Sequence, residues 1–359
     1  MSDCLKQISS AGVSIWLDDL SRARLADASL KKLIDQDNVV GVTTNPSIFN
    51  NAISNSDLYA SDIKSMAHLS IDEIITELTC SDVSRACDLF NDVFIKSNQI
   101  DGRISIEVDP RFARDTHSTI EQGKSLWQKI NKANLLIKVP ATDQGLPAIT
   151  ALIGAGISVN VTLIFSLERY RQVLDAYTAG IELAAKNNKV LQNIFSVASF
   201  FISRIDSEVD KLLAPDSNLR GKAAIANAVM AYQYFEEFSR SARWQKLQEL
   251  GANLQRPLWA STGVKDPAYD PTRYVMQLVA KNCVNTMPEA TLNEVRNNGV
   301  FVKDSITSNY QSAKLTLAQL ANAQIDLDQI TKFLEDDGVS KFEKAWLELI
   351  DSVKLTAGK

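Results

Sequence analysis

Lys138 lies inside a short apolar run, Leu135–Pro140, whose length and composition predict a buried strand. A lysine in such a run must lose the hydration of its ammonium group, and burial favours the neutral amine. A neutral amine is a nucleophile that can form a Schiff base with a carbonyl compound. The alternative is a lysine at a strand end whose ammonium group extends to solvent. Taken alone, this alternative is the commoner case, so the decision rests on the remaining residues.

Polar side chains that suit carbonyl chemistry lie in or directly after the other apolar runs of the chain. An amine nucleophile with carboxylates as proton carriers fits a reaction through an imine, because a protonated imine accepts electrons when a neighbouring carbon–carbon bond breaks. Amide and hydroxyl groups fit the hydroxyls of a sugar. The candidate side chains besides Lys138 are Asp18, Thr43, Asn45, Glu107, Asn160, Thr162, Ser199 and Ser261.

Several of these residues also have structural interpretations. Asp18 and Asp19 are adjacent, so only one can point inward, and either could cap a following helix over residues 20–28. Glu107 could instead pair with a core arginine. Asn45 precedes Pro46 and could cap the helix that begins there.

A second cluster is typical of a phosphate site. Arg204 follows the sixth apolar run, and Ser261-Thr262-Gly263-Val264-Lys265 follows the seventh. A guanidinium group, an ammonium group, hydroxyls and a glycine that permits close backbone approach suit a phosphate monoester. Surface charge is the alternative for each basic residue taken alone.

Eight short apolar or β-rich runs must position these side chains, and helix-patterned segments such as 118–131, Leu167–Lys186 and 220–250 separate most of them. Strands that alternate with helices in this number predict an α/β fold, a (β/α)8 barrel. We expect one domain over residues 1–359, with the barrel at about 12–291, a helical insertion at about 46–100 after the second strand, and a helical tail at about 299–359. The expected strands are 13–18, 39–44, 103–108, Leu135–Pro140, 156–165, 194–201, 257–262 and 283–288.

The polar residues share a phase along these strands. Ser105 and Glu107 alternate with apolar residues, as do Asn160 and Thr162, and Lys138 lies between Ile137 and Val139. Successive strand residues point to opposite faces, so each strand has an apolar face and a face that turns polar toward its end. Barrel enzymes carry catalytic groups at the carboxyl ends of the strands. The pattern therefore predicts a shared polar cavity there.

Composition excludes several classes of protein. The net charge of −5 and the absence of a basic patch argue against a nucleic-acid partner. No apolar stretch approaches the ~20 residues of a membrane span, and residues 1–6 lack the pattern of a secretory signal. His68 and His117 are the only histidines, so neither a metal site nor a Ser-His-Asp triad is expected, and no nucleotide-binding glycine motif occurs. Four scattered cysteines favour the cytoplasm with reduced thiols.

Five segments together resemble the transaldolase family, whose members are class I (Schiff-base) aldolase-type (β/α)8 barrels. The resemblance covers about residues 12–291, and Thr43-Thr44-Asn45-Pro46 combined with Lys138 is its most specific part. The segment after the seventh strand departs from the Ser-Phe-Arg of many members and is similar to a longer transaldolase subfamily. The matching segments are 15–22, 41–47, 103–110, 136–142 and 160–166.

The resemblance implies roles in catalysis. Lys138 would form the imine with the donor ketose, and Asp18 would carry the proton in aldol cleavage. Glu107 and Thr162 would hold and activate the water used in imine formation and hydrolysis. No cofactor and no metal is implied.

It also implies roles in substrate binding. Asn45 and Asn160 would bind substrate hydroxyls with the support of Thr43. Phe201 stands at the aromatic position where fructose-6-phosphate aldolases tend to carry tyrosine, which favours a transaldolase. Lys265 would take the place of the arginine that many members carry after the seventh strand. The phosphate would be held by Ser199, Arg204, Ser261 and Lys265.

The expected activity is transfer of a dihydroxyacetone unit between sedoheptulose 7-phosphate and glyceraldehyde 3-phosphate, which gives erythrose 4-phosphate and fructose 6-phosphate. This is a step of the non-oxidative pentose phosphate pathway. The expected partners are sugar phosphates, with neither nucleic acid nor membrane, and the chain would be a monomer or homodimer. The alternatives are an aldolase that uses free dihydroxyacetone, a pyridoxal-phosphate enzyme with the cofactor on Lys138, and a non-catalytic sugar-phosphate binding protein.

Overall fold

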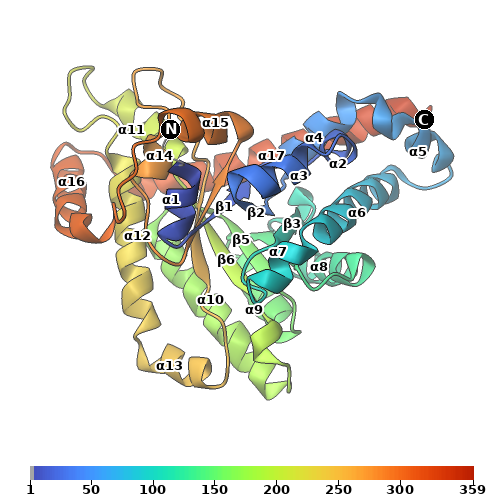
Figure 1. Ribbon diagram of the computed structural model, residues 1–359, viewed down its shortest axis with the longest axis horizontal. Coiled ribbons are helices and arrows are strands. Elements are labelled where there is room, and N and C mark those ends of the chain that lie inside the picture. The colour runs from blue at the N-terminus through green and yellow to red at the C-terminus, as the bar shows by residue number, and fades with distance from the viewer. Residues whose placement is uncertain (1–3) are drawn as a thin grey trace.

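The computed structural model describes residues 4–359 and contains a closed barrel of eight parallel strands in the order of the chain (Figure 1). Each strand coincides with one of the eight expected runs, so the prediction of a (β/α)8 barrel is confirmed. The strands are β1 (Val13–Leu17), β2 (Val39–Val42), β3 (Arg103–Glu107), β4 (Leu135–Pro140), β5 (Val159–Ile164), β6 (Ser196–Phe201), β7 (Arg256–Ala260) and β8 (Cys283–Met287).

The register between strands sets the level of the polar side chains. Glu107 of β3 pairs with Lys138 of β4, and Lys138 pairs in turn with Asn160 of β5. Two residues further along the same strands, Pro140 pairs with Thr162. Paired residues on neighbouring strands point to the same face, so these side chains meet inside the barrel near the carboxyl ends of its strands.

Helices surround the barrel, and the segment 118–131 is confirmed as helical by α8. The expected helix over 220–250 is two helices, α12 and α13, because the hydroxyl of Ser241 accepts a hydrogen bond from the backbone N–H of Trp244 and starts a new helix. The barrel helices are α1 (Cys4–Ser10), α2 (Arg22–Ala26), α3 (Ser29–Asp37), α8 (Thr116–Ile130), α9 (Gly145–Gly154), α10 (Leu167–Lys186), α11 (Ser203–Leu212), α12 (Ala223–Ser239), α13 (Ala242–Glu249), α14 (Arg273–Met276) and α15 (Glu289–Asn298).

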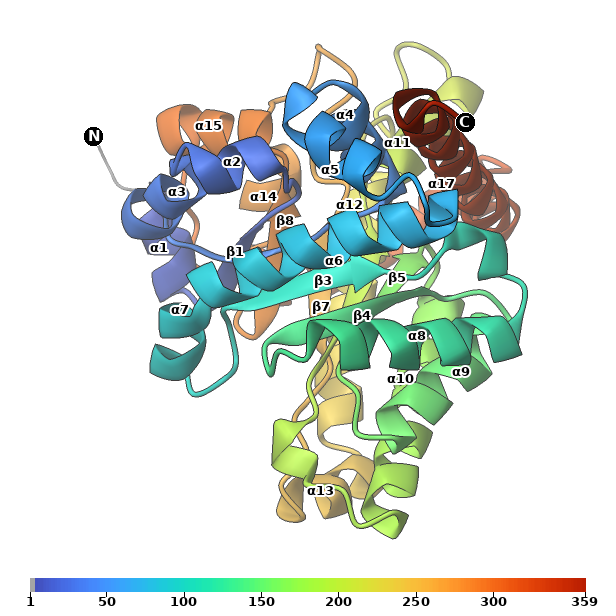
Figure 2. The ribbon, with the colours of Figure 1, turned by 90° about the vertical axis from the view of Figure 1, so that its right-hand side faces the viewer.

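The insertion after the second strand and the C-terminal extension are both helical, as expected. The insertion comprises α4 (Pro46–Ser54), α5 (Ala60–Ser65), α6 (Ile71–Leu89) and α7 (Asn91–Lys96). The extension comprises α16 (Tyr310–Asn322) and α17 (Leu327–Ala357), and residues 299–359 as described include no strand. Helix α17 packs against α4, α6 and β5, and Figure 2 shows it beside α4 and α5 at one end of the barrel. The single domain stays a prediction.

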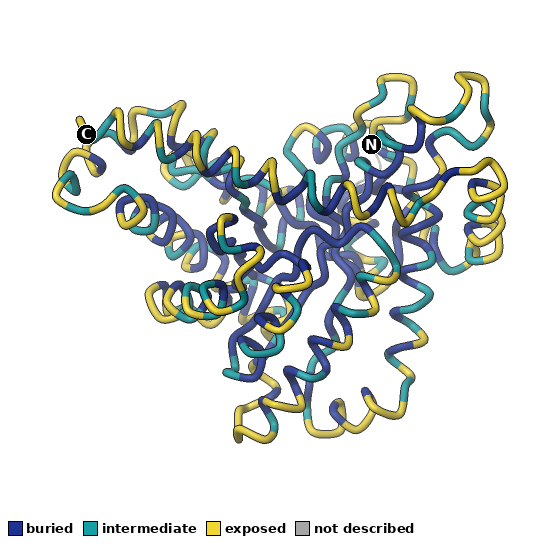
Figure 3. The backbone as a smooth tube through the Cα atoms, turned by 180° about the vertical axis from the view of Figure 1, so that it is seen from behind, coloured by how far each residue is buried: buried dark blue, intermediate teal, exposed yellow. Residues whose placement is uncertain are grey.

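Burial follows the barrel. The strands and the inward faces of the helices are buried, whereas the outer helix faces and connecting loops are exposed (Figure 3). The four cysteines all lie within the described residues and are buried. In the described chain no helix combines the length and hydropathy that crossing a membrane requires. Residues 1–3, part of the segment considered for a secretory signal, lie outside the described residues.

Candidate active site

A polar cavity of about 200 Å³ opens at the carboxyl ends of the strands. Its lining is drawn from seven of the eight strands or the segments that follow them, all except β3, and from α17. All of the predicted site residues except Glu107 and Asn160 line it, namely Asp18, Thr43, Asn45, Lys138, Thr162, Ser199, Phe201, Arg204, Ser261 and Lys265.

A larger cavity of about 380 Å³ lies at the opposite end of the barrel, where the strands begin. Its charged groups already pair with each other, because Arg256 donates hydrogen bonds to Ser14 at 2.8 Å and to Asp101 at 3.0 Å. The carboxyl end of the barrel, which gathers the predicted side chains, is therefore the candidate site.

Lys138 is buried, with 4% of its surface exposed. Its Nζ donates hydrogen bonds to Glu107 Oε2 at 2.9 Å and to the carbonyl oxygen of Thr44 at 3.0 Å. The ammonium group therefore does not extend to bulk solvent, which contradicts the alternative interpretation of this lysine.

Glu107 lies beside Lys138 on the neighbouring strand and is not among the residues that line the cavity. Its ion-pair partner is Lys138 and not a core arginine. Burial raises the pKa of Glu107 above its usual 4.5, and the positive charge of Lys138 opposes part of that rise. A carboxylate with a raised pKa next to an amine is suited to exchange a proton with it.

Asp18 is the inward member of the Asp18–Asp19 pair. Its backbone N–H donates to the carbonyl oxygen of Met287. This bond extends the pairing of β1 with β8 by one residue, so the alternation of inward and outward side chains in β1 continues to Asp18. Its Oδ1 accepts a hydrogen bond from Thr43 Oγ1 at 2.7 Å. Asp19 points the other way and pairs with Arg24 at 2.6 Å. Burial raises the pKa of Asp18, and Lys138 again opposes the rise.

Asn45 combines a structural position with access to the cavity. Its Oδ1 accepts a hydrogen bond from the backbone N–H of Ile48 at 3.0 Å and so caps α4, and the residue also lines the cavity. The neighbouring Thr43 Oγ1 lies 2.7 Å from Thr286 Oγ1 on β8. The cap that one interpretation of Asn45 predicted is therefore present beside the cavity.

Asn160 is fully buried and is not among the residues that line the cavity. Its Nδ2 donates to Ser105 Oγ at 3.0 Å, and its Oδ1 accepts from Ser199 Oγ at 2.7 Å. It thereby fixes Ser199, which does line the cavity. Thr162 Oγ1 is buried and has no hydrogen-bond partner among the described residues. A buried hydroxyl without a protein partner on the cavity wall is available to water or substrate.

The expected phosphate cluster lies together on one side of the cavity. The Arg204 guanidinium group lies 5.2 Å from the centroid of the Phe201 ring, and its Nη1 is buried without a partner among the described residues. Burial lowers the pKa of Arg204. Ser261 has a left-handed backbone, with φ of 55°, which directs its hydroxyl toward Ser203 at 3.0 Å. Lys265 completes this side.

Besides Gly263, which belongs to the expected phosphate cluster, five lining residues were not predicted from the sequence: Ser47, Ala260, Thr286, Pro288 and Phe342. Thr286 lies within an expected strand, but Asn285 and Thr286 are adjacent polar residues, so alternation does not single out Thr286 there. Ser47 lies in the segment that carries the resemblance. Phe342 lies on α17, and nothing in its local sequence indicates that this helix crosses the barrel mouth.

Comparison with known proteins agrees with this geometry. The model of the transaldolase/fructose-6-phosphate aldolase family matches residues 15–353. The chain is 48% identical to a transaldolase of Thermobifida fusca (strain YX) over 98% of each chain. It is 51% identical to a transaldolase of Arthrobacter sp. (strain FB24) and 50% identical to transaldolase 2 of Streptomyces coelicolor, over 99% of this chain and 97% of each relative. The chain belongs to the transaldolase/fructose-6-phosphate aldolase family.

Proposed function

We propose that this chain acts as a transaldolase, a transferase in which Lys138 forms the Schiff base. The observation that carries the proposal is the buried Lys138 Nζ, 2.9 Å from Glu107 Oε2, on the wall of a polar cavity that Asp18 also lines. The donor would be fructose 6-phosphate or sedoheptulose 7-phosphate, and the acceptor glyceraldehyde 3-phosphate or erythrose 4-phosphate.

Imine formation would begin with transfer of a proton from Lys138 to Glu107. The free amine then attacks the ketose carbonyl carbon, and the carbinolamine loses water to give a protonated imine. Glu107 and Thr162 would guide that water, because Glu107 contacts Nζ and the Thr162 hydroxyl has no partner among the described residues.

Carbon–carbon cleavage would use Asp18 as the base. It accepts the proton of the donor hydroxyl next to the breaking bond, and that oxygen forms the aldehyde carbonyl. The electron pair of the broken bond forms the enamine double bond, and the electron pair of the imine double bond moves to the nitrogen. The aldehyde product leaves, and a three-carbon enamine stays on Lys138. The enamine carbon then attacks the acceptor aldehyde, Asp18 returns the proton to the new hydroxyl, and hydrolysis frees the product and the amine.

The remaining lining residues would bind the sugar phosphate. Asn45 and Ser199, the latter oriented by Asn160, suit substrate hydroxyls, with Thr43 holding Asp18. Arg204, Ser261 and Lys265 suit the phosphate, because a guanidinium with an unpartnered buried nitrogen gains most from an anionic partner. The proposed setting is the cytoplasm and the non-oxidative pentose phosphate pathway, with the chain as a monomer or homodimer.

Borohydride trapping tests nucleophile and substrate together. Incubation with fructose 6-phosphate and borohydride should add a reduced three- or six-carbon adduct to Lys138, located by peptide mass spectrometry. Lys138→Ala should remove both the adduct and transfer activity, whereas Lys344→Ala, at an exposed lysine of α17, should retain both. Full activity in Lys138→Ala would refute the proposal. Equal rates with free dihydroxyacetone and with fructose 6-phosphate as donor would point to the rival aldolase.

A further inference from the structure

Helix α17 is the part of the active site that neither the strands nor the sequence motifs explain. It follows all eight strands in the chain and runs alongside α4 and α6 at the carboxyl end of the barrel (Figures 1 and 2). One of its side chains, Phe342, lines the cavity. The helix therefore contributes directly to the chamber around Lys138.

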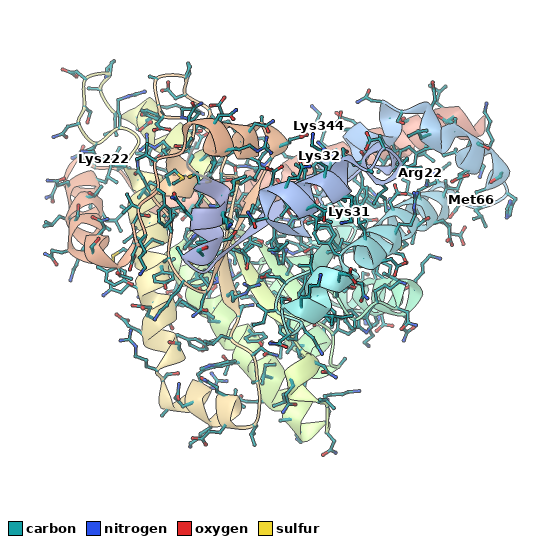
Figure 4. The ribbon with its side chains drawn as sticks, viewed as in Figure 1. Arg22, Lys31, Lys32, Met66, Lys222 and Lys344 are labelled. Carbon is teal, nitrogen blue, oxygen red and sulfur yellow. The ribbon has the colours of Figure 1, made fainter. Side chains whose placement is uncertain are left out.

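Phe342 points into the barrel. It is 4% exposed, and its ring centroid lies 5.6 Å from Lys138 Nζ. Lys344, two residues further along, extends from the outer side of α17 with its side chain 78% exposed (Figure 4). Phe333, on the same helix, is 54% exposed. The face of α17 that carries Phe342 thus covers the nucleophile, whereas the other face meets solvent.

A glycine one turn earlier permits this close approach. A Cβ atom at Gly338 would lie 2.9 Å from Leu163 Cδ2 and 3.7 Å from Arg204 Nη1. Leu163 itself has φ of 59° directly after Thr162, a left-handed conformation that is an outlier for a bulky residue. The partly buried ion pair between Glu335 and Arg169, at 3.1 Å, joins α17 to the start of α10. These contacts set the height of the Phe342 ring above Lys138.

In a Schiff base on Lys138, the substrate carbon atoms bonded to Nζ would lie next to the Phe342 ring. An apolar ring there excludes water and favours a cationic nitrogen beneath it. We propose that Phe342 is a specificity-determining residue of the transfer reaction: its ring shields the three-carbon unit on Lys138 from water until the acceptor binds. This inference rests on the proposed role of Lys138 as the Schiff-base lysine.

The shielded intermediate has two fates. In transfer, its enamine carbon forms a bond to the acceptor aldehyde. In release, that carbon takes up a proton, water adds to the resulting imine carbon, and the carbon–nitrogen bond breaks. Free dihydroxyacetone then leaves, and the Lys138 amine is restored. The water consumed balances the water lost when the imine formed, so the side reaction needs no other reagent.

The ratio of release to transfer tests the proposal. It is measured with fructose 6-phosphate as donor, from free dihydroxyacetone and from transfer to erythrose 4-phosphate. Phe342→Ala should raise the ratio roughly tenfold, the change that about 1.4 kcal/mol of differential barrier gives. Phe342→Leu, which retains an apolar side chain, should give a smaller rise. Phe333→Ala, at the exposed phenylalanine of the same helix, should leave the ratio unchanged.

A purely structural role predicts a different result, because both rates would then fall in proportion. An unchanged or lowered ratio in Phe342→Ala overturns the proposal. If circular dichroism and thermal melting show that this variant does not fold, the ratio is measured in Phe342→Leu, where an unchanged or lowered value overturns the proposal equally. Borohydride trapping separates the two proposals. Absence of an adduct on wild-type Lys138 refutes the Schiff-base assignment, whereas an adduct with an unchanged ratio refutes only the role of Phe342.

Discussion

Glu107 Oε2 lies 2.9 Å from Lys138 Nζ, across the paired strands β3 and β4, and both side chains are buried. A buried carboxylate and a buried ammonium group each lose hydration, so each depends on the other for compensation. In the proposed mechanism Lys138 Nζ must lose a proton before it attacks a carbonyl, and this contact places a proton acceptor next to it. This one ion pair therefore both stabilises two buried charges and supplies the proton acceptor of the proposed mechanism.

Glu107→Gln should keep the shape of the pair and remove its basicity. We expect the transfer rate to fall by roughly 10²–10⁴-fold, the usual contribution of a positioned acid or base. Glu121→Gln is a matched control, because Glu121 is an exposed residue that pairs with Lys124 on α8. The measurement is a coupled transfer assay together with the rate of borohydride trapping. Equal rates for wild type and Glu107→Gln would exclude proton exchange through this residue.

Asp18 and Asp19 offer an internal comparison of neighbouring carboxylates. Asp18→Asn should lower transfer by roughly 10²–10⁴-fold because it removes the proposed base of the cleavage step. Asp19→Asn breaks a partly exposed ion pair with Arg24 and should cost at most about 1 kcal/mol of stability, with little effect on rate. Asp18→Asn should still give the trapped adduct, since imine formation precedes cleavage. A larger loss of transfer rate in Asp19→Asn than in Asp18→Asn would assign the base to Asp19 instead.

The raised pKa of Asp18 predicts a dependence of stability on pH. Between the usual value of 3.8 and the raised value, the folded chain binds more protons at this group than the unfolded chain does. The free energy of unfolding therefore falls as the pH rises through that interval, by about 1.4 kcal/mol for each pKa unit. Urea unfolding of wild type and Asp18→Asn from about pH 4 to about pH 7 measures the effect. Asp18→Asn should show the smaller decrease, and parallel curves would contradict it.

Lys265→Ala should weaken binding of phosphorylated substrates. A charge-assisted hydrogen bond contributes about 1.5–3 kcal/mol, so KM for fructose 6-phosphate should rise roughly ten- to a hundredfold. The value of kcat should change much less, because Lys265 follows β7 whereas Lys138 lies on β4, three strands away around the closed barrel. Lys222→Ala, at an exposed lysine labelled in Figure 4, is the control. A fall in kcat at unchanged KM would remove Lys265 from the phosphate site.

Gly338→Ala tests the close contact between α17 and β5. Helix propensity alone would make alanine more stable than glycine by about 1 kcal/mol. Leu163 is buried, however, and an added Cβ would approach its Cδ2 to 2.9 Å, so overpacking of about 1–3 kcal/mol should outweigh that gain. The net change should be a loss in thermal unfolding. Ser340→Ala, at an exposed position of the same helix, should alter stability by less than about 0.5 kcal/mol.

The barrel could be predicted from the alternation of strand-like and helix-like segments, and much of the cavity wall from the alternation of polar and apolar residues within the strands. Lys138, Asn160 and Thr162 alternate with apolar residues, and the period of two in a strand places them inside together. That signal does not distinguish the cavity surface from the layer beneath it. Asn160 and Glu107 were therefore expected on the wall, yet neither lines the cavity, and they are hydrogen-bonded to Ser199 and Lys138.

Two features depend on contacts between distant segments. The choice of Asp18 over Asp19 follows from the backbone hydrogen bond between Asp18 and Met287, which extends the strand phase beyond β1. The position of Phe342 follows from the packing of α17 against Leu163 through Gly338. Neither relationship leaves a periodic pattern in the local sequence, so neither could be predicted from it.

The location of Phe342 has a consequence for the order in which activity appears during synthesis. The ribosome completes all eight strands, with Lys138 and its carboxylates, before it makes α17. The barrel strands and the helix that covers them are therefore synthesised in succession, and a nascent chain contains the proposed nucleophile before it contains the Phe342 ring. Only the complete chain can therefore place the Phe342 ring 5.6 Å from Lys138 Nζ.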